Sequence, residues 1–465
     1  MTAVRPGKIS AARGKKLIGE RALKLAVVGF SAAQMLAGFL RAATTRLRNS
    51  ALLAIRSSRN YTRFNLPEEE DPVKKICFAV SLALIAAGSA LAQEKTIKIA
   101  GFGAKSGVVR SFGVNSEAAM LAAADVINKQ GGVKLADGSK AKIAVDFYDD
   151  RCNAEEGISV IRRIYGTDAV VAVGPTCSNV AEPLFGILQK KVDDKGDSGL
   201  QMPVFTDVAI KVGLARISEW AFRNVPNETT MYSSLFYWLK TKYPNVQTVY
   251  GGVEEDFAHS RASWYAVMKD RAEANGYKVL GNSKWLVNDT NFATQVREMK
   301  NANADVIAIA AHPFTTCGVL KEMQRQGVKP KVLVGLTSSS SLETLQGCAK
   351  QAEGIIIPTS FAPVTKEGKF AAEQTAKFKG AADLHSMAAW ENMFILKQVM
   401  ESEKISGDKN QLQADRHKIR DGLAKLRETQ GLLGVTKRTE DREADKPYLF
   451  VHANKGEWKV LHNPL

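Results

Sequence analysis

Strand-like and helix-like segments alternate along the chain from Lys95 onward, and this alternation restricts the fold more than any other feature of the sequence. Short β-branched or apolar runs predict strands at residues 95–103, 142–150, 169–176 and 202–208. Between them, segments with a helical apolar period predict helices at residues 115–132, 154–166 and 178–191. Repeated strand–helix units predict a mostly parallel sheet with helices on both of its faces.

A second series of the same kind begins near Thr248. Its expected strands lie at 248–253, 277–286, 304–312, 331–337 and 353–358, and its expected helices at 260–275, 292–301 and 318–326. Two such series predict an α/β fold with two similar doubly wound lobes, which suits a chain too long for a single core. Residues 369–426 are expected to be mainly helical, and YLFVHANKGEWKVL near the end predicts a hairpin with its turn at 454–456.

The segment VKKICFAVSLALIAAGSALAQEK, which begins at Val73, is charged first and then apolar. Two lysines precede an apolar run from Ile76 to Ala87, and small residues end the segment at Ala92. This order is typical of a secretory signal peptide, so we expect residues 73–92 to be cleaved off after Ala92 and the protein to be exported. The run is too short to span a bilayer as a helix. A buried core helix is the weaker alternative, because lysines and small residues flank the run.

Residues 1–72 precede this signal and are basic, with 13 Lys or Arg against 5 Asp or Glu. Our hypothesis is that translation begins at Val73, which would make residues 1–72 a mis-assigned or disordered basic extension. A genuine basic arm that associates with membranes is the alternative. Without residues 1–92, about +6 remains of the formal charge of +16. The mature chain then has no basic stripe that would favour nucleic-acid binding.

Four cysteines remain after the predicted cleavage: Cys152, Cys177, Cys317 and Cys348. An even number of cysteines behind an export signal predicts disulfides, and the residues alone leave all three connectivities open. The sequence has no C-x-x-C, no H-x-x-H and no Cys/His cluster with zinc spacing. Structural pairing is therefore favoured over metal binding, and no metal site is expected.

The sequence contains no positive signal for catalysis or for a cofactor. The stretch GFGAKSG at residues 101–107 lacks the dinucleotide-binding spacing and the ending of a phosphate loop, so we interpret it as a strand-to-helix turn. The six histidines are scattered, and no G-x-S-x-G stretch occurs. We expect neither an enzyme nor a bound cofactor.

Polar and aromatic residues stand at the carboxyl ends of the predicted strands, where ligands bind in parallel α/β sheets. These residues are Ser106-Gly107, Cys177-Ser178, Asp207, Asp256-Phe257, His312 and Thr337. Ser178 would open a helix, where free N–H groups and the helix dipole suit an anionic ligand group. A plain helix-capping role for this serine fits the pattern equally well.

The stretch KIAGFGAKSGVVRSFGVNSEAAMLAAADVINKQGGV, together with YDDRCN and GPTCS, resembles the periplasmic leucine/isoleucine/valine-binding protein family of bacteria. These proteins are the type 1 substrate-binding components of ABC importers. The resemblance extends through EGIIIP and YLFVHANKGEWKV and covers nearly all of residues 94–461. It implies two Rossmann-like lobes that are joined by three crossover strands and close on a ligand. Lobe 1 would comprise residues 93–223 plus 359–445, and lobe 2 residues 224–358 plus 446–465.

The resemblance also implies a location, partners and disulfides. It implies a periplasmic monomer that captures a small molecule and delivers it to an inner-membrane ABC permease. A signalling sensor that presents the ligand to a membrane receptor is the alternative of another class. The implied disulfides are Cys152–Cys177 near the cleft and Cys317–Cys348 in lobe 2.

Four site residues carry over from the resemblance one position at a time. Ser178 matches the serine that holds the ligand carboxylate with its hydroxyl and amide. Phe112 matches a tyrosine of lobe 1 that covers the ligand. Phe257 and His312 match two aromatic residues of lobe 2 that close over it.

Two departures from the family pattern bear on the ligand. The loop from Asp207 through Ala209 to Lys211 matches the one that binds the ligand's amino group, but Ile210 replaces its threonine. Thr337 stands where the amino-acid binders place an acid against the ligand ammonium. A buried ammonium without a carboxylate partner is costly.

The preferred ligand is therefore a small carboxylate with an apolar or aromatic body. Arg110 or Lys211 would add positive charge, unless they are ordinary surface residues. The alternative ligand is a branched-chain or other amino acid, with Asp207 or Asp256 supplying the negative charge.

Overall fold

The computed structural model describes residues 95–207 and 209–464, which belong to one compact unit, Gln93–Leu465. The expected extension, residues 1–72, and the expected signal peptide, residues 73–92, lie outside the described residues. Within the described part, no helix is long and apolar enough to cross a membrane.

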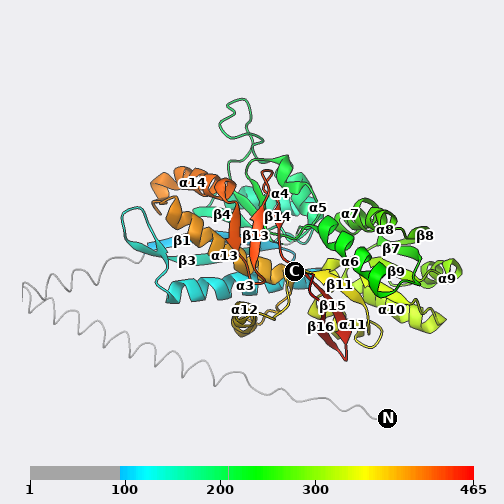
Figure 1. The fold of residues 1–465 in the computed structure, drawn as a ribbon. Coiled ribbons are helices and arrows are strands. Elements are labelled where there is room, and N and C mark those ends of the chain that lie inside the picture. The colour runs from blue at the N-terminus through cyan, green and yellow to red at the C-terminus, as the bar shows by residue number, and fades with distance from the viewer. Residues whose placement is uncertain (1–94, 208, 465) are drawn as a thin grey trace, which may run out of the picture. The chain divides into compact units, whose positions relative to one another are not determined.

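The first half of the described chain forms a six-stranded sheet (Figure 1). Its strands are β1 (Lys95–Gly103), β2 (Val133–Lys134), β3 (Lys140–Asp149), β4 (Ala169–Val173), β5 (Val204–Thr206) and β6 (Ala221–Arg223). Their spatial order is β2-β3-β1-β4-β5-β6, and all neighbours are parallel except β2 and β3. The five parallel strands follow the doubly wound order 2-1-3-4-5.

The second sheet has seven strands and repeats this order. Its strands are β7 (Thr248–Glu254), β8 (Lys278–Trp285), β9 (Val306–Ala310), β10 (Val332–Gly335), β11 (Ile356–Thr359), β15 (Leu449–Asn454) and β16 (Glu457–His462). The spatial order is β16-β15-β11-β10-β9-β7-β8, in which β15 and β16 are the antiparallel additions. The strands β8-β7-β9-β10-β11 are parallel and again follow the order 2-1-3-4-5. The predicted fold of two doubly wound lobes is confirmed.

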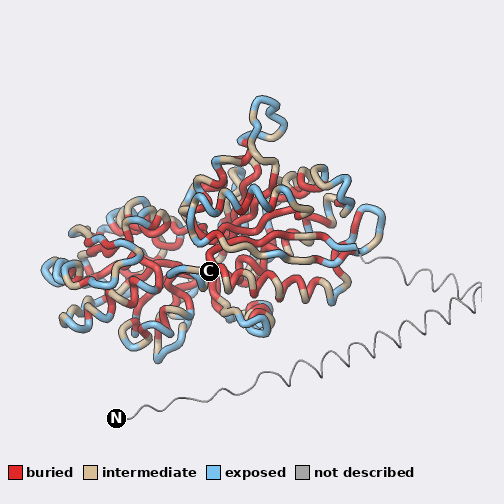
Figure 2. Tube along the Cα trace, turned by 180° about the vertical axis from the view of Figure 1, so that it is seen from behind, coloured by how far each residue is buried: buried red, intermediate tan, exposed pale blue. Residues whose placement is uncertain are grey.

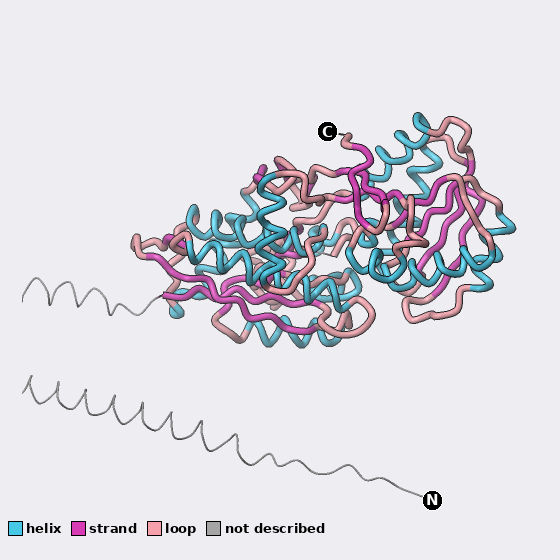
Figure 3. Tube along the Cα trace, turned by 90° about the horizontal axis from the view of Figure 1, so that it is seen from below, coloured by secondary structure: helices cyan, strands magenta, loops and turns pink. Residues whose placement is uncertain are grey.

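Helices cover both faces of each sheet (Figure 3). The helices around the first sheet are α3 (Arg110–Lys129), α4 (Ala154–Tyr165), α5 (Ser178–Gly186), α12 (Lys366–Lys377), α13 (Leu384–Ser402) and α14 (Leu412–Lys425). Those around the second are α6 (Glu228–Lys242), α7 (Ala258–Ser263), α8 (Lys269–Ala274), α9 (Ala293–Ala302), α10 (Pro313–Gln326) and α11 (Leu342–Cys348). A small third sheet joins β12 (Glu428–Gln430), β13 (Val435–Arg438) and β14 (Ala444–Asp445).

Each large sheet separates two hydrophobic cores, because successive side chains of a strand point to opposite faces. Ile97 and Ile99 of β1 belong to the core under α3 and α13, whereas Ala100 and Phe102 of the same strand belong to the core under α4 and α5. Two further cores flank the second sheet. The buried residues, red in Figure 2, run through the interior of both halves.

The chain passes between the two large sheets three times, after β6, after β11 and after β14. These passages are the three crossovers that the family resemblance implies. We use the predicted residue ranges of the two lobes as the definitions of lobe 1 and lobe 2 below.

Local sequence signals explain where several helices begin and end. Asn153 caps α4 and accepts hydrogen bonds from the backbone N–H groups of Glu155 and Glu156. Asp383 and Ser386 form a reciprocal capping box at the start of α13. Gly327 ends α10 in the left-handed conformation, with a φ of 72°, which a residue without Cβ adopts at little cost.

Several predicted elements differ from the structure in their bounds, and three examples follow. Helix α3 begins at Arg110 and not near residue 115, because the turn after β1 is short. The helix expected at 260–275 is interrupted by a π-turn at Trp264–Met268. The strand expected at 202–208 is confined to β5, Val204–Thr206.

Candidate functional site

The predicted site residues lie where ligands bind in doubly wound sheets, at the switch point where the strand order reverses. In lobe 1 this point lies between β1 and β4, and in lobe 2 between β7 and β9. Phe112 is on the first turn of α3, and Ser178 is the first residue of α5, directly after β4. Phe257 follows β7 and His312 follows β9. All four side chains are buried.

Aromatic rings from the two lobes meet at this place. The ring centroid of His312 lies 4.0 Å from that of Phe257 and 5.9 Å from that of Phe112. On the far side of Phe112, the imidazole of His385 lies 4.7 Å away. His259 adds a third imidazole, with its centroid 5.5 Å from that of His312. The structure thus brings Phe112, Phe257 and His312 together as predicted, and it adds His259 and His385.

Ser178 lies beside a direct contact between the lobes. Its Oγ accepts a hydrogen bond from the backbone N–H of Lys211 at 3.2 Å, so the hydroxyl proton remains free to donate. The neighbouring Asn179 reaches lobe 2, where its Oδ1 accepts from the N–H of Ala258 at 2.7 Å and its Nδ2 donates to the carbonyl of Asp256 at 3.4 Å.

Glu254, the last residue of β7, forms a fully buried carboxylate–imidazole pair with His312. His312 Nδ1 lies 2.5 Å from Glu254 Oε2, and the backbone N–H of His312 donates to Oε1 at 3.1 Å. The hydroxyls of Ser260 and Thr315 also donate to this carboxylate. Burial alone would raise the pKa of Glu254, but His312 and the hydroxyl donor outweigh it and hold the pKa below its usual value.

A second buried pair joins Glu228, at the start of α6, to His259 of α7. Glu228 Oε1 lies 3.0 Å from His259 Nε2, and the hydroxyls of Ser263 and Thr337 donate to the same carboxylate. Burial would raise the pKa of Glu228, but His259 and these donors outweigh it and lower the pKa.

The sequence-based expectation that Thr337 leaves lobe 2 without an acid at this place is wrong, because Thr337 contacts the carboxylate of Glu228 directly. Glu254 could have been found, since it directly follows the strand predicted at 248–253 and lies two positions before Asp256. Glu228 follows a crossover and carries no such signal.

Three buried carboxyl groups of lobe 1 have no cationic partner among the described residues. Asp207 Oδ2 accepts from the hydroxyl of Ser116 at 2.6 Å, while its Oδ1 is buried and bonded to no other described residue. Burial, together with the charges of Asp383 and Asp150, raises the pKa of Asp207 to about 7. Burial likewise raises the pKa of Asp150 to about 7 and that of Asp383 to about 6.

Several predicted residues lie elsewhere or are already engaged. Arg110 is exposed on the first turn of α3. Lys211 forms an ion pair with Glu182, with an Nζ–Oε2 distance of 2.5 Å. The carbonyl of Ala209 accepts hydrogen bonds from Nε and Nη2 of Arg223, at 3.3 and 3.1 Å. The contacts of Lys211 and Ala209 reduce what these two residues offer to a ligand.

Asp256 also has a structural partner. Its Oδ1 accepts from the N–H of Val287 at 2.9 Å, within lobe 2. This bond holds the turn that follows β7, the turn that also carries Phe257.

Both predicted disulfides are confirmed. Cys152 pairs with Cys177 and Cys317 with Cys348, with Cα–Cα distances of 5.6 and 5.3 Å. The first bridge lies in lobe 1 and ends one residue before Ser178. The second lies in lobe 2 and ties α10 to the end of α11.

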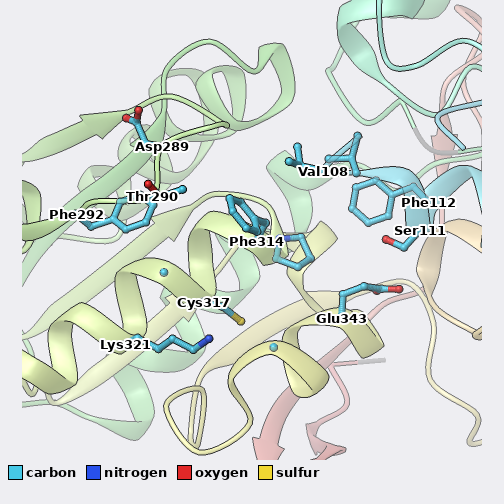
Figure 4. A pocket seen from close by; sticks show the side chains of 14 residues that line it. Val108, Ser111, Phe112, Asp289, Thr290, Phe292, Phe314, Cys317, Lys321 and Glu343 are labelled. Atoms are coloured by element: carbon cyan, nitrogen blue, oxygen red, sulfur yellow. The ribbon is translucent and has the colours of Figure 1, made fainter. Parts of the chain in front are cut away.

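A pocket of about 490 Å³ opens between the lobes on the outer side of Phe112 (Figure 4). Lobe 1 contributes Val108, Val109, Ser111 and Phe112, from the turn before α3 and the start of that helix. Lobe 2 contributes residues of α10 and α11, among them Phe314, Lys321 and Glu343. Of the predicted ligand-binding residues, Phe112 alone lines this pocket, so the pocket is an approach to the aromatic cluster and not the cluster itself. Across residues 95–207 and 209–464, no three His, Cys, Asp or Glu side chains are placed to hold a metal ion.

Two doubly wound lobes with three crossovers and ligand-type residues at both switch points define a two-lobed binding protein. Comparison with known families agrees, because the periplasmic binding protein family model matches residues 96–457. The chain belongs to this family.

Individual relatives are distant. The Leu/Ile/Val-binding protein of Escherichia coli K12 is 22% identical over 286 residues, which cover 61% of this chain and 72% of that protein. The branched-chain amino acid transporter substrate-binding protein of Streptococcus pneumoniae, solved with isoleucine, is 20% identical with a TM-score of 0.65 and covers 79% of this chain and 100% of its own. An ABC transporter solute-binding protein of R. palustris, solved with benzoate, is 14% identical with a TM-score of 0.66 and covers 79% and 96%. At these identities the solved structures show the fold alone.

Proposed function

We propose that this protein is the periplasmic substrate-binding component of an ABC importer and that it captures a small organic acid with an apolar or aromatic body. The two lobes close on the ligand and deliver it to an inner-membrane permease. The mature chain starts at Gln93, works as a monomer and catalyses no reaction.

The observation that carries this proposal is the state of the two buried glutamates of lobe 2. A carboxylate has about four acceptor positions. Glu254 receives four protein donors, two on each oxygen. Glu228 receives three, and an imidazole offsets its charge. A ligand ammonium at Glu254 would have to displace one of these donors, and Glu228 has room for only one more, whereas a ligand without an ammonium needs neither carboxylate.

The remaining surroundings suit an organic acid. Phe112 and Phe257 provide apolar rings whose centroids lie 5.9 and 4.0 Å from that of His312. At the other end, Ser178 has a free hydroxyl proton at the start of α5, where a carboxylate is stabilised by the helix dipole. A fold relative that was solved with benzoate is consistent with this ligand class, but it supplies no residue of this site.

A thermal-shift panel tests the proposal. The protein is unfolded and refolded without reductant to strip carried-over ligand, and is then heated with benzoates, cinnamates, leucine, isoleucine and valine. A ligand at about 100 times its Kd adds roughly 2.7 kcal/mol to the free energy of unfolding. We expect aromatic acids to raise Tm and the branched-chain amino acids to leave it unchanged.

The variant Ser178→Ala shows whether the shift comes from the proposed site. It should lose most of the aromatic-acid shift, whereas Ser159→Ala, an exposed serine on α4, should keep it. A shift by leucine alone, lost in Ser178→Ala, would overturn the organic-acid proposal and leave the binding-protein role intact.

An amino-acid ligand is the second candidate, and Asp207 is the observation that favours it. Its buried Oδ1 is free of protein donors in the described part of the chain, and a ligand ammonium placed there would be a suitable partner. If Asp207→Asn abolishes a leucine-induced rise in Tm, this second candidate replaces the first.

A further inference from the structure

The pocket between the lobes is large enough to hold part of a ligand. Its volume of about 490 Å³ falls within the range of about 300–1,000 Å³ that is usual for small-molecule sites. Val109 and Phe112 line this pocket. The same two residues belong to the hydrophobic core that contains Cys177 and Phe257. The pocket therefore borders the proposed ligand site and forms an extension of it.

Helix α10 forms one wall of the pocket. Four lining residues of this helix recur at the positions i, i+3, i+4 and i+7 and therefore share one face: Phe314, Cys317, Gly318 and Lys321. The disulfide Cys317–Cys348 ties this face to α11, which contributes Glu343 and Gly347. Gly318 and Gly347 place no side chain into the pocket, which leaves the space beside the two helices open.

Two large apolar side chains at this pocket are exposed to solvent. Val108 of lobe 1 is 43% exposed, and Phe314 of lobe 2 is 47% exposed. Both line the pocket, although they come from elements far apart in the sequence (Figure 4). Exposed apolar side chains that gather in a concave place mark a binding site, because an apolar partner removes them from water. The pocket is thus suited to an apolar group.

The charges of the pocket decide which end of the ligand it receives. Its lining carries two carboxylates, Asp289 and Glu343, and one ammonium, Lys321. One oxygen of Glu343 is buried without a partner in the described part of the chain. A ligand carboxylate would be repelled by these acids, whereas at the start of α5 it meets the free hydroxyl proton of Ser178. The pocket therefore suits the uncharged end of an organic acid.

We propose that this pocket binds the apolar tail of the ligand, so that the protein prefers organic acids with an extended arylalkyl chain over compact acids such as benzoate. The proposal rests on the proposed organic-acid function and names the ligand class of that site. The carboxylate lies at Ser178, the chain runs past Phe112, and the tail lies between Val108 and Phe314.

Isothermal titration calorimetry with a series of acids of increasing length tests the proposal. The series is benzoate, phenylacetate, 3-phenylpropanoate, 4-phenylbutanoate and 5-phenylpentanoate, in which each member adds one methylene. A methylene that becomes buried lowers Kd by about three- to fourfold. We expect Kd of the wild-type protein to fall by about tenfold or more from benzoate to the member that binds most tightly.

Two variants show whether this gain comes from the pocket. Phe314→Ala removes apolar surface from the wall that lobe 2 contributes, and Val108→Asn does so on the side of lobe 1. Both side chains are exposed, so neither change disturbs the cores. In each variant the ratio of Kd for benzoate to Kd for the longer acid should fall to within about threefold. Phe378→Ala is the matched control, because Phe378 is 39% exposed at the end of α12 and does not line the pocket. It should keep the wild-type ratio.

If the acids bind but Kd does not depend on chain length, the inference is wrong and the proposed function stands. The same holds if the gain survives in both pocket variants, or if Phe378→Ala loses as much of it as they do. If no acid of the series binds the wild-type protein, the proposed function fails and the inference fails with it.

Discussion

The two lobes bring buried acids to their junction in opposite states. In lobe 2, Glu228 and Glu254 each face an imidazole, accept several further hydrogen bonds, and have a lowered pKa. In the described part of lobe 1, Asp207 and Asp383 face no cation, and burial raises the pKa of Asp207 to about 7 and that of Asp383 to about 6. The protein thus stabilises the charged form of the acids in lobe 2, whereas burial disfavours the charged form of the acids in lobe 1.

Because of this difference, we expect the buried acids of lobe 2 to contribute to stability and those of lobe 1 to ligand recognition. A fully bonded carboxylate–imidazole pair fixes the strand ends of lobe 2 and offers little to a ligand. An unpaired buried carboxyl destabilises its charged form, and a binding partner can relieve that penalty. Ligand selection is therefore expected to depend more on lobe 1, where Ser178, Asp207 and His385 retain unused hydrogen-bonding capacity.

The largest effect is expected from breaking a lobe 2 pair. Glu228→Gln removes the charge that faces His259, and loss of one partner of a buried pair typically lowers the free energy of unfolding by about 3–5 kcal/mol. Urea denaturation of the ligand-free protein measures this loss. Glu273→Gln, which breaks an exposed pair with Lys269, should change it by less than about 0.5 kcal/mol. An equal loss in both variants would contradict the claim that the buried Glu228–His259 pair stabilises lobe 2 more than an exposed pair does.

The two disulfides should contribute nearly equal amounts to the free energy of unfolding. The bridges Cys152–Cys177 and Cys317–Cys348 span 25 and 31 residues. In the chain-entropy model each contributes about 3–4 kcal/mol. Two double Cys→Ala variants, compared by calorimetric unfolding, should therefore lose similar amounts. Only the variant of the first pair should also weaken ligand binding, because Cys177 directly precedes Ser178.

The pH dependence of stability should come from lobe 1. The pKa of Asp207 is raised from an unfolded value near 4 to about 7 in the folded protein. The folded state therefore binds more protons, and stability falls as pH rises between about 4 and 7. Asp207→Asn should remove part of this slope and raise the free energy of unfolding by about 2 kcal/mol at about pH 8.

Urea titrations across this pH range test the prediction on Asp207. The exposed Asp146→Asn is the control, which should keep the wild-type slope. A wild-type slope in Asp207→Asn would show that Asp207 ionises as freely in the folded protein as in the unfolded chain.

The smallest effect is expected at Arg110. Its side chain is exposed on α3, so Arg110→Ala should change Kd for the organic acid by less than about twofold. Calorimetric titration at low and high salt checks this. A large, salt-dependent loss of affinity in Arg110→Ala would show that Arg110 contributes positive charge to the ligand site.

The fold could be predicted because periodicity is a local property. Two runs of strand–helix units determine two doubly wound lobes, and the ends of the strands place Ser178, Phe112, Phe257 and His312 near one another. The interruption of the helix at Trp264–Met268 could not be predicted, because it depends on packing against the rest of lobe 2.

The polar partners within the site could not be predicted either, because they are brought together only by the tertiary fold. Glu228 and Thr337 are 109 positions apart, and the sequence gives no sign of their contact. The unsatisfied state of His385 is likewise visible only when every group around it is known. Residue types at strand ends thus locate a site, but they do not show which of its charges the protein has already paired.

Calorimetric titration with leucine and 4-methylpentanoate, and with phenylalanine and 3-phenylpropanoate, tests the central claim most directly. The members of each pair differ only in the ammonium group. The comparison therefore isolates the effect of that group on Kd and shows whether the paired glutamates of lobe 2 can bind it. The account predicts that the acid without the ammonium binds at least about tenfold more tightly in one or both pairs. Tighter binding of the amino acid in both pairs would contradict it and would point to Asp207 as the partner of the ammonium.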